Sequence, residues 1–150
     1  MTERRGQVWV AVQFVLFCGI LATPFFGRFA APVWLRPLGA LVLIEGIAVM
    51  VAGYRALGRS HSPWTTPIAG GALVRTGIYR HMRHPIYSGW ILLALGWALL
   101  WGSSLGLWVA VAILIYYDLR TREEEKWLRQ RYADYVTYAQ QVKRFIPGLY

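Results

Sequence analysis

Apolar residues gather in long stretches of this 150-residue chain, separated by polar and basic segments. Residues 8–26 carry no charge, and residues 37–54 carry a single one, Glu45. A helix of about 20 apolar residues is long enough to cross a bilayer. Both stretches are therefore predicted to be membrane-spanning helices.

A third apolar stretch, residues 86–117, is too long for one span and is interrupted by Gly-Ser-Ser, a turn signal. It predicts a short helical hairpin, with spans at residues 86–101 and 104–118, whose two ends leave the membrane on the same side. Residues 118–143 are dense in charge and are predicted to form one long amphipathic helix.

The composition supports a membrane protein, because 57% of the residues are hydrophobic and 15% are charged, whereas soluble domains have nearer a quarter charged. The predicted fold is all-α: a polytopic membrane helical bundle with about four transmembrane helices, the last two a short hairpin, plus a cytoplasmic C-terminal amphipathic helix. A single domain is expected over residues 1–150.

The basic residues indicate the topology. Of the 16 Lys and Arg residues, 14 precede the first span, lie between the second and third, or follow the fourth; only Arg28 and Arg36 lie opposite. The positive-inside rule then places both termini and the central loop in the cytoplasm, at the inner membrane if the protein is bacterial. Topology and anionic membrane lipids account for the net charge of +9, so no nucleic-acid partner is expected.

Two polar clusters could carry chemistry, and the hairpin brings them to one membrane surface. The first, residues 77–89, lies at the start of the third span, where Pro85 suits a first helical turn whose N–H groups could bind a ligand carboxylate. The alternative is a basic interfacial anchor with an aromatic belt. No metal is expected, because His61, His81 and His84 have no Cys partner and match no usual spacing.

The second cluster, residues 120–128, places Arg120, Glu124 and Leu128 on one helix face. Glu124 could receive the ammonium of a ligand, and the alternative is a solvated charge run. Glu45 is a separate candidate inside a span. It could line a polar approach for a substrate head group, or it could be protonated and packed against another helix.

At these clusters the sequence resembles the isoprenylcysteine carboxyl methyltransferase and phospholipid methyltransferase superfamily of membrane enzymes. The shared pattern is Gly77-x-Tyr79-x-x-x-Arg83-His84-Pro85-x-Tyr87-x-Gly89, followed by Glu124-Glu125-x-x-Leu128. The resemblance covers roughly residues 70–147.

The resemblance implies an S-adenosylmethionine site between the hairpin and the C-terminal helix, in the same residues 70–147. It implies that the catalytic residues are Arg120, near the transferred methyl and the acceptor, and Glu124, which would also meet the amino group of the cofactor. The cofactor-binding residues would be Tyr79, Arg83, His84, Pro85, Tyr87, Gly89 and Glu124. The acceptor would be a lipophilic molecule from the bilayer, such as an isoprenylcysteine-like carboxylate or a lipid amine.

Two other functions stay open at this point. One is an NADPH-dependent membrane reductase of the sterol reductase type, although Ile86 stands where those proteins favour Asn. The other is a non-catalytic membrane scaffold, against which the intact Arg83, His84 and Glu124 count. Small residues of the second span could pack against another helix of the same chain or of a second copy; these are Gly39, Ala40, Gly46, Ala48 and Gly53.

Overall fold

The computed structural model describes residues 2–29, 32–58 and 71–150, with side chains from residue 6 onward. His61, considered above as a metal ligand, lies outside the described residues. Among the described residues, no group of three or more His, Cys, Asp or Glu side chains is placed to hold a metal ion.

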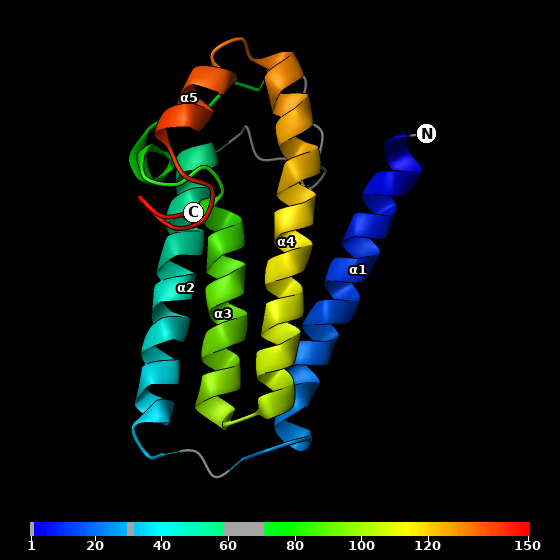
Figure 1. The fold of residues 1–150 in the computed structure, drawn as a ribbon, viewed down its shortest axis with the longest axis vertical. Helices are drawn as coiled ribbons and strands as arrows, with labels where there is room; N and C mark the ends of the chain where they lie inside the picture. The colour runs from blue at the N-terminus through cyan, green and yellow to red at the C-terminus, as the bar shows by residue number, and fades with distance from the viewer. Residues whose placement is uncertain (1, 30–31, 59–70) are drawn as a thin grey trace.

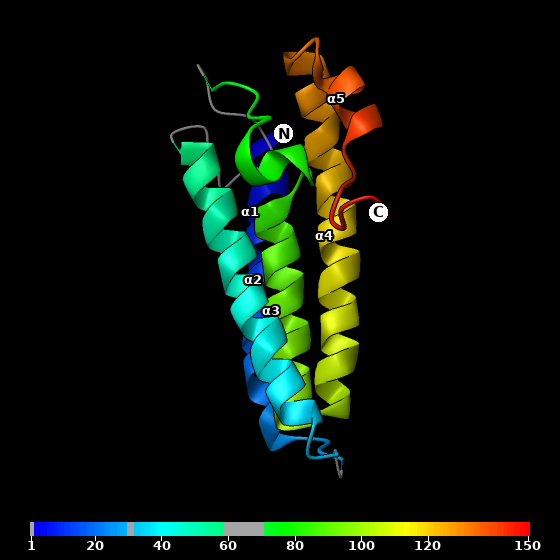
Figure 2. The ribbon, with the colours of Figure 1, turned by 90° about the vertical axis from the view of Figure 1, so that its left-hand side faces the viewer.

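Four long helices lie side by side along the longest axis of the molecule (Figures 1 and 2). They are α1 (Thr2–Ala22), α2 (Leu35–Leu57), α3 (Pro85–Trp101) and α4 (Ser104–Arg131). Three of them, α1, α2 and α4, are long and apolar enough to cross a membrane, and α3 is a shorter apolar helix. The predicted all-α bundle with an α3–α4 hairpin is confirmed.

The region after the hairpin differs from the prediction of one helix over residues 118–143. The fourth span does not stop at Asp118; α4 continues to Arg131, because its charged residues favour helix. The chain then turns at Tyr132, whose backbone is extended, and forms the short helix α5 (Tyr135–Gln141). This turn brings Tyr135 and Tyr138 back to buried positions, whereas a straight helix would carry them away from the bundle.

Glycines let α2 and α3 approach until their backbones touch. Gly39, Gly46 and Gly53 are buried on α2, one every seven residues. On α3, a Cβ added to Gly96 would lie 2.7 Å from the backbone nitrogen of Leu43. The small residues of the second span therefore pack within the chain, and this contact fixes α3 against α2.

The turn between α3 and α4 closes the end of the bundle opposite α5 (Figure 1). Gly102 adopts the left-handed conformation with φ of 59°, which glycine reaches without steric cost. The fully buried Ser103 hydroxyl donates to the carbonyl oxygen of Thr23 at 3.1 Å and accepts from the N–H of Gly106, which caps α4. The end of α1 is thereby tied to the hairpin.

Glu45 lies near the middle of α2, and its side chain is exposed. The protein therefore does not bury it against another of its own helices. Its neighbour Gly46 is the residue that faces α3.

Candidate functional site

The start of α3 is held by the segment that follows α5. The 3₁₀ helix η3 (Gly77–Arg80) leads into it, and His84 precedes the first turn with Pro85 at its first position. The N–H groups of Arg83 and His84 donate to the carbonyl oxygens of Lys143 and Arg144 at 2.8 and 3.1 Å. Those two N–H groups are thus engaged within the protein and are not turned toward a ligand.

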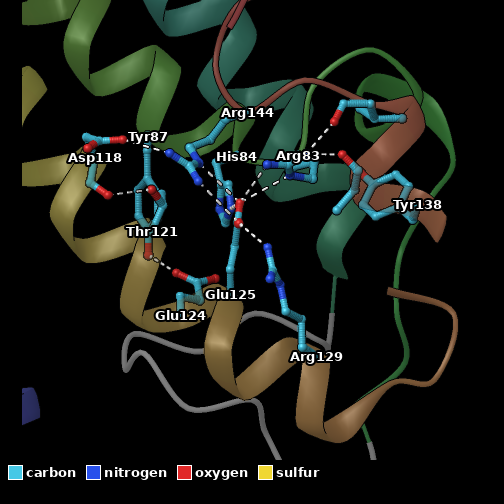
Figure 3. A network of polar contacts seen from close by, with 12 residues as sticks. Arg83, His84, Tyr87, Asp118, Thr121, Glu124, Glu125, Arg129, Tyr138 and Arg144 are labelled. Carbon is cyan, nitrogen blue, oxygen red and sulfur yellow. Dashed lines mark hydrogen bonds and ion pairs between the residues drawn. The ribbon is translucent and has the colours of Figure 1, made fainter. Parts of the chain in front are cut away.

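Glu125 is the centre of a buried ionic cluster at this end of the bundle (Figure 3). Only 2% of the residue is exposed. Arg83 donates to its carboxylate from Nη2 at 2.9 Å and from Nε at 3.1 Å, and His84 Nε2 lies 3.2 Å from it. Arg144 approaches at 3.2 Å, and Arg129 lies 3.7 Å away. One carboxylate therefore joins α4 to the start of α3 and to the segment after α5.

The electrostatics of this cluster favour the ionised form of Glu125. The residue lies 21 residues after the start of α4, about 32 Å along the helix, so it lies beyond a hydrocarbon core of roughly 30 Å that begins at that end. Burial would raise the pKa of Glu125, but hydrogen bonds from His84 and Arg144 and the charges of His84 and Arg83 outweigh it and hold the pKa well below 4.5.

The remaining guanidinium nitrogen of Arg83 links the start of α3 to the end of α5. Nη1 donates to the carbonyl oxygens of Ala139 and Val142 at 2.6 and 2.5 Å, at the end of α5. Nearby, the hydroxyl of Tyr138 donates to the carbonyl oxygen of Tyr79 at 2.6 Å, and burial raises the pKa of Tyr138 to about 12. The structure thus uses Arg83 and Tyr79, both predicted to bind a cofactor, to hold α5 in place.

Glu124, the neighbour of Glu125, lies in a different environment. Its carboxylate is half-buried and accepts a hydrogen bond of 2.7 Å from the hydroxyl of Tyr87 (Figure 3). Within the part of the chain that the structure describes, Glu124 forms no ion pair. The ring of Tyr87 stacks between aromatic neighbours, with centroids 5.6 Å from His84 and 4.7 Å from Tyr117.

Arg120 lies one turn before Glu124 on α4, on the face of the same tyrosine ring. It is 4% exposed, and its guanidinium carbon lies 5.4 Å from the centroid of the Tyr87 ring. Its Nη1 donates to the hydroxyl of Tyr116 at 2.9 Å and to Oε1 of Gln13 at 2.6 Å. Arg120, Tyr87 and Glu124 therefore form one connected group, in which a cation faces the ring and a carboxylate faces its hydroxyl.

Two predicted cofactor residues face the neighbouring helix. A Cβ on Gly89 would lie 2.7 Å from the carbonyl oxygen of Gly46, so the close packing of α2 accounts for this glycine. Pro85 is fully buried, and its Cγ lies near Gly53 of α2. The structure places both in the α2–α3 contact and away from the Arg120–Tyr87–Glu124 group.

Sequence reasoning missed Glu125, Arg144 and Gln13. The Glu-Glu pair drew attention to Glu124 alone, although the second glutamate is the more buried. Arg144 is separated from Glu125 by the turn after α4, so no helical spacing relates the two. Gln13 is a polar amide within an apolar span, a signal that could have been weighed.

A bundle of apolar helices with a polar and aromatic cluster at one end defines this chain as an integral membrane protein. The comparison with protein families then identifies its class. The family model described as phospholipid methyltransferase matches residues 34–135, which include α2, η3, α3 and α4, end at the start of α5 and leave α1 outside. The chain belongs to this family, and the resemblance seen in the sequence is confirmed.

Named relatives agree with this family. A protein-S-isoprenylcysteine O-methyltransferase of Saccharomyces cerevisiae is 35% identical over 117 residues, which cover 73% of this chain and 48% of the relative. Protein-S-isoprenylcysteine O-methyltransferase B of Arabidopsis thaliana is 29% identical over 119 residues, which cover 76% of this chain and 60% of the relative. The chain thus spans about half to three-fifths of the length of these relatives.

Proposed function

We propose that this protein transfers a methyl group from S-adenosylmethionine to a carboxylate or amine carried by a lipophilic acceptor in the membrane. The observation that supports it is the placement of two residues of opposite charge at Tyr87, with Arg120 over its ring and Glu124 at its hydroxyl. Family membership and the names of the relatives favour methyl transfer.

The chemistry of the cofactor fits these residues. S-adenosylmethionine carries an ammonium group and a positively charged sulfur. Glu124 has a half-buried carboxylate that is bonded to a neutral phenol, so it can take up an ammonium as a charge-assisted partner. The clustered rings of Tyr87, Tyr116 and Tyr117 favour a cation beside them.

In this proposal Arg120 orients the acceptor and Glu124 anchors the donor. S-adenosylmethionine supplies an electrophilic methyl group, which must lie about 3–3.5 Å from the attacking atom and in line with it. A carboxylate acceptor needs no base, and Arg120 holds it by charge-assisted hydrogen bonds. An amine acceptor must first lose a proton, which Glu124 can accept.

Other residues of the predicted site act through this group. The Glu125 cluster, with Arg83 and His84, holds the start of α3, and so fixes Tyr87. Tyr79, Pro85 and Gly89 set the packing around α3. We propose one domain with its site within residues 70–147, facing the cytoplasm together with both termini. In a bacterium this would be the inner membrane.

Binding of the cofactor is the direct test. Calorimetry on purified protein in detergent should detect binding of S-adenosylmethionine. Glu124→Ala should weaken the affinity at least about tenfold, because it removes one charged hydrogen bond to the cofactor. Glu123→Ala is the matched control, because Glu123 pairs with the exposed Lys126 on the surface. Absence of binding to the wild-type protein at millimolar cofactor would refute the proposal.

Transfer of a radiolabelled methyl group identifies the acceptor. A suitable panel contains an S-prenylated cysteine with a free carboxylate, its methyl ester, and phosphatidylethanolamine. Labelling of the free carboxylate is the expected result, in keeping with the names of the relatives. Labelling of the phospholipid alone would assign the amine acceptor instead.

A further inference from the structure

The segment that follows α5 leads into a loop with an apolar outer surface. This apolar loop, residues 145–150, has no charged side chain. Phe145 is buried, whereas Ile146 and Leu149 are 50% and 74% exposed. Exposed apolar side chains grouped in this way mark a surface that contacts a protein partner or a membrane. The depth of the loop in the bundle decides between the two.

Two hydrogen bonds fix how far the apolar loop reaches along the bundle. The hydroxyl of Ser88 donates to the backbone oxygen of Phe145 at 3.0 Å, and the hydroxyl of Tyr150 donates to Oδ1 of Asp118 at 2.8 Å. Ser88 lies 13 residues before the end of α3, and Asp118 lies 14 residues after the start of α4. Both residues are therefore about 20 Å from the hairpin turn between the two helices.

The hairpin turn marks the far edge of the hydrocarbon in the proposed four-span topology. Arg28 lies there, with its guanidinium carbon 5.3 Å from the centroid of the Trp101 ring, and both side chains favour the membrane–water interface. A level about 20 Å from this edge lies inside a hydrocarbon core of roughly 30 Å and past its midplane. In Figure 1 the segment after α5 runs back from the end of the bundle to the start of α3. The apolar loop is therefore level with the acyl chains of the cytoplasmic leaflet.

The backbone of the apolar loop is suited to lipid. The N–H groups of Phe145 and Ile146 donate to the backbone oxygen of Tyr150 at 2.7 and 2.6 Å. Those of Leu149 and Tyr150 donate to the backbone oxygen of Ile146, each at 3.1 Å, and Pro147 has no N–H to satisfy. Since hydrocarbon offers no partner to a backbone donor, this internal pairing is what contact with lipid requires.

The cation next to the apolar loop is paired inside the protein. Arg144 lies 2.8 Å from the carboxylate of Asp118 and 3.2 Å from that of Glu125, so its charge is neutralised away from the outer surface. At the same level, α4 exposes the apolar side chains of Ile115 and Leu119. The loop and the helix therefore present apolar side chains to the same layer of the membrane.

We propose that the apolar loop is seated in the membrane, with Ile146 and Leu149 in contact with the acyl chains of the cytoplasmic leaflet. Lipid is the occupant that fits, because the loop continues the lipid-facing level of α4 and pairs its own backbone donors. The preceding residues accept the N–H groups of Arg83 and His84, so the leaflet also helps to hold the start of α3. This inference does not depend on methyl transfer.

Spin labelling of single cysteines in lipid nanodiscs tests the proposal. In a Cys18→Ser background, a nitroxide is attached to Ile146→Cys or to Val136→Cys, two positions that are both 50% exposed. Val136 is the matched control because it lies on α5, at the end of the bundle. Ile44→Cys, an exposed position of the span α2, gives the reference for lipid.

Collisions of the nitroxide with oxygen, which dissolves in hydrocarbon, are compared with collisions with a water-soluble nickel chelate. The logarithm of the ratio of oxygen to nickel collisions should be positive at position 146, as at position 44, and negative at position 136. A negative value at position 146 would place the loop in water, and poor access of both reagents would mean that protein covers it; either result would overturn the proposal. Leu149→Cys repeats the measurement at a second site, so the outcome does not rest on one variant.

Discussion

The two adjacent glutamates of α4 have different partners, one charged and the other a neutral hydroxyl. Successive residues of a helix point about 100° apart, and this separation directs Glu125 into a group of cations and Glu124 toward the hydroxyl of Tyr87. The sequence predicted that a glutamate here would matter, because the Glu-Glu pair lies one turn after Arg120. It could not tell which one would be buried, since that depends on how α3 and the segment after α5 surround the helix.

Removal of the Glu125 carboxylate should destabilise the protein strongly. Glu125→Ala would leave Arg83 and Arg144 partly buried beside one another with no anion between them, a change that costs about 3–5 kcal/mol. Thermal unfolding in detergent should show a large fall in midpoint. Glu123→Ala should change the stability by less than about 0.5 kcal/mol, because its ion pair with Lys126 is exposed. Equal midpoints for the two variants would contradict the role given to Glu125.

Acidification should remove the stability that the ionised Glu125 gives the wild-type protein. The pKa of Glu125 is lower in the folded protein than its ordinary value of 4.5. A carboxylate whose pKa is lowered by folding stabilises the folded state at pH values above its unfolded pKa. This stabilisation is lost as the pH falls below about 4.5 toward the pKa of the folded protein. The difference in unfolding midpoint between wild type and Glu125→Gln should therefore shrink between about pH 6 and about pH 3. A difference that stays constant over this range would argue against an ionised Glu125.

At the scale of the elements, the spans were predictable and their ends were not. The predicted span 86–101 matches α3 to within one residue, and the predicted span 37–54 lies inside α2, which is two residues longer at its start and three at its end, since only an uninterrupted apolar helix satisfies its backbone in lipid. The end of α4 was not visible, because the residues after Asp118 favour helix both inside and outside a membrane. The turn at Tyr132 arises from tertiary contacts, among them the bond from its hydroxyl to the carbonyl oxygen of Gly71.

The glycines between α2 and α3 give a test of their contact. Gly96→Ala should destabilise the protein by about 1–3 kcal/mol through overpacking, because the added Cβ would lie 2.7 Å from a backbone atom of α2. Thermal unfolding measures the change. Gly19→Ala is the control, since a Cβ there meets nothing within 4 Å; it should be neutral or stabilise α1 by up to about 1 kcal/mol. A neutral Gly96→Ala would show that the two helices stand further apart.

At the scale of the whole molecule, the number of spans and the side of the membrane on which the site lies are predictions from charge and hydropathy together. Figure 1 places α5, the starts of α1 and α3, and the end of α4 at the same end of the bundle. Span counting predicted this arrangement, because the hairpin must return the chain to the side it left. The docking of the C-terminal segment on residues 82–84 was not predictable, because it depends on backbone pairing between distant segments.

Labelling of single cysteines tests the orientation. In a Cys18→Ser background, Arg36→Cys and Lys126→Cys place thiols at exposed sites near the two ends of the bundle. A membrane-impermeant maleimide added to intact cells should modify position 36 and should reach position 126 only after permeabilisation, as the positive-inside rule requires. The reverse pattern would invert the proposed orientation, and labelling of both positions from outside would exclude the four-span topology.

The shortness of α3 has a consequence for how the proposed acceptor would arrive. Its 17 residues span about 25 Å, less than the roughly 30 Å of typical hydrocarbon. A bilayer can accommodate such a short helix by becoming thinner around it. Arg120 and Tyr87 would then sit near the level where acyl chains begin. An anchored acceptor could present its head group there without its tail being extracted, and membrane thickness would itself become a control on turnover.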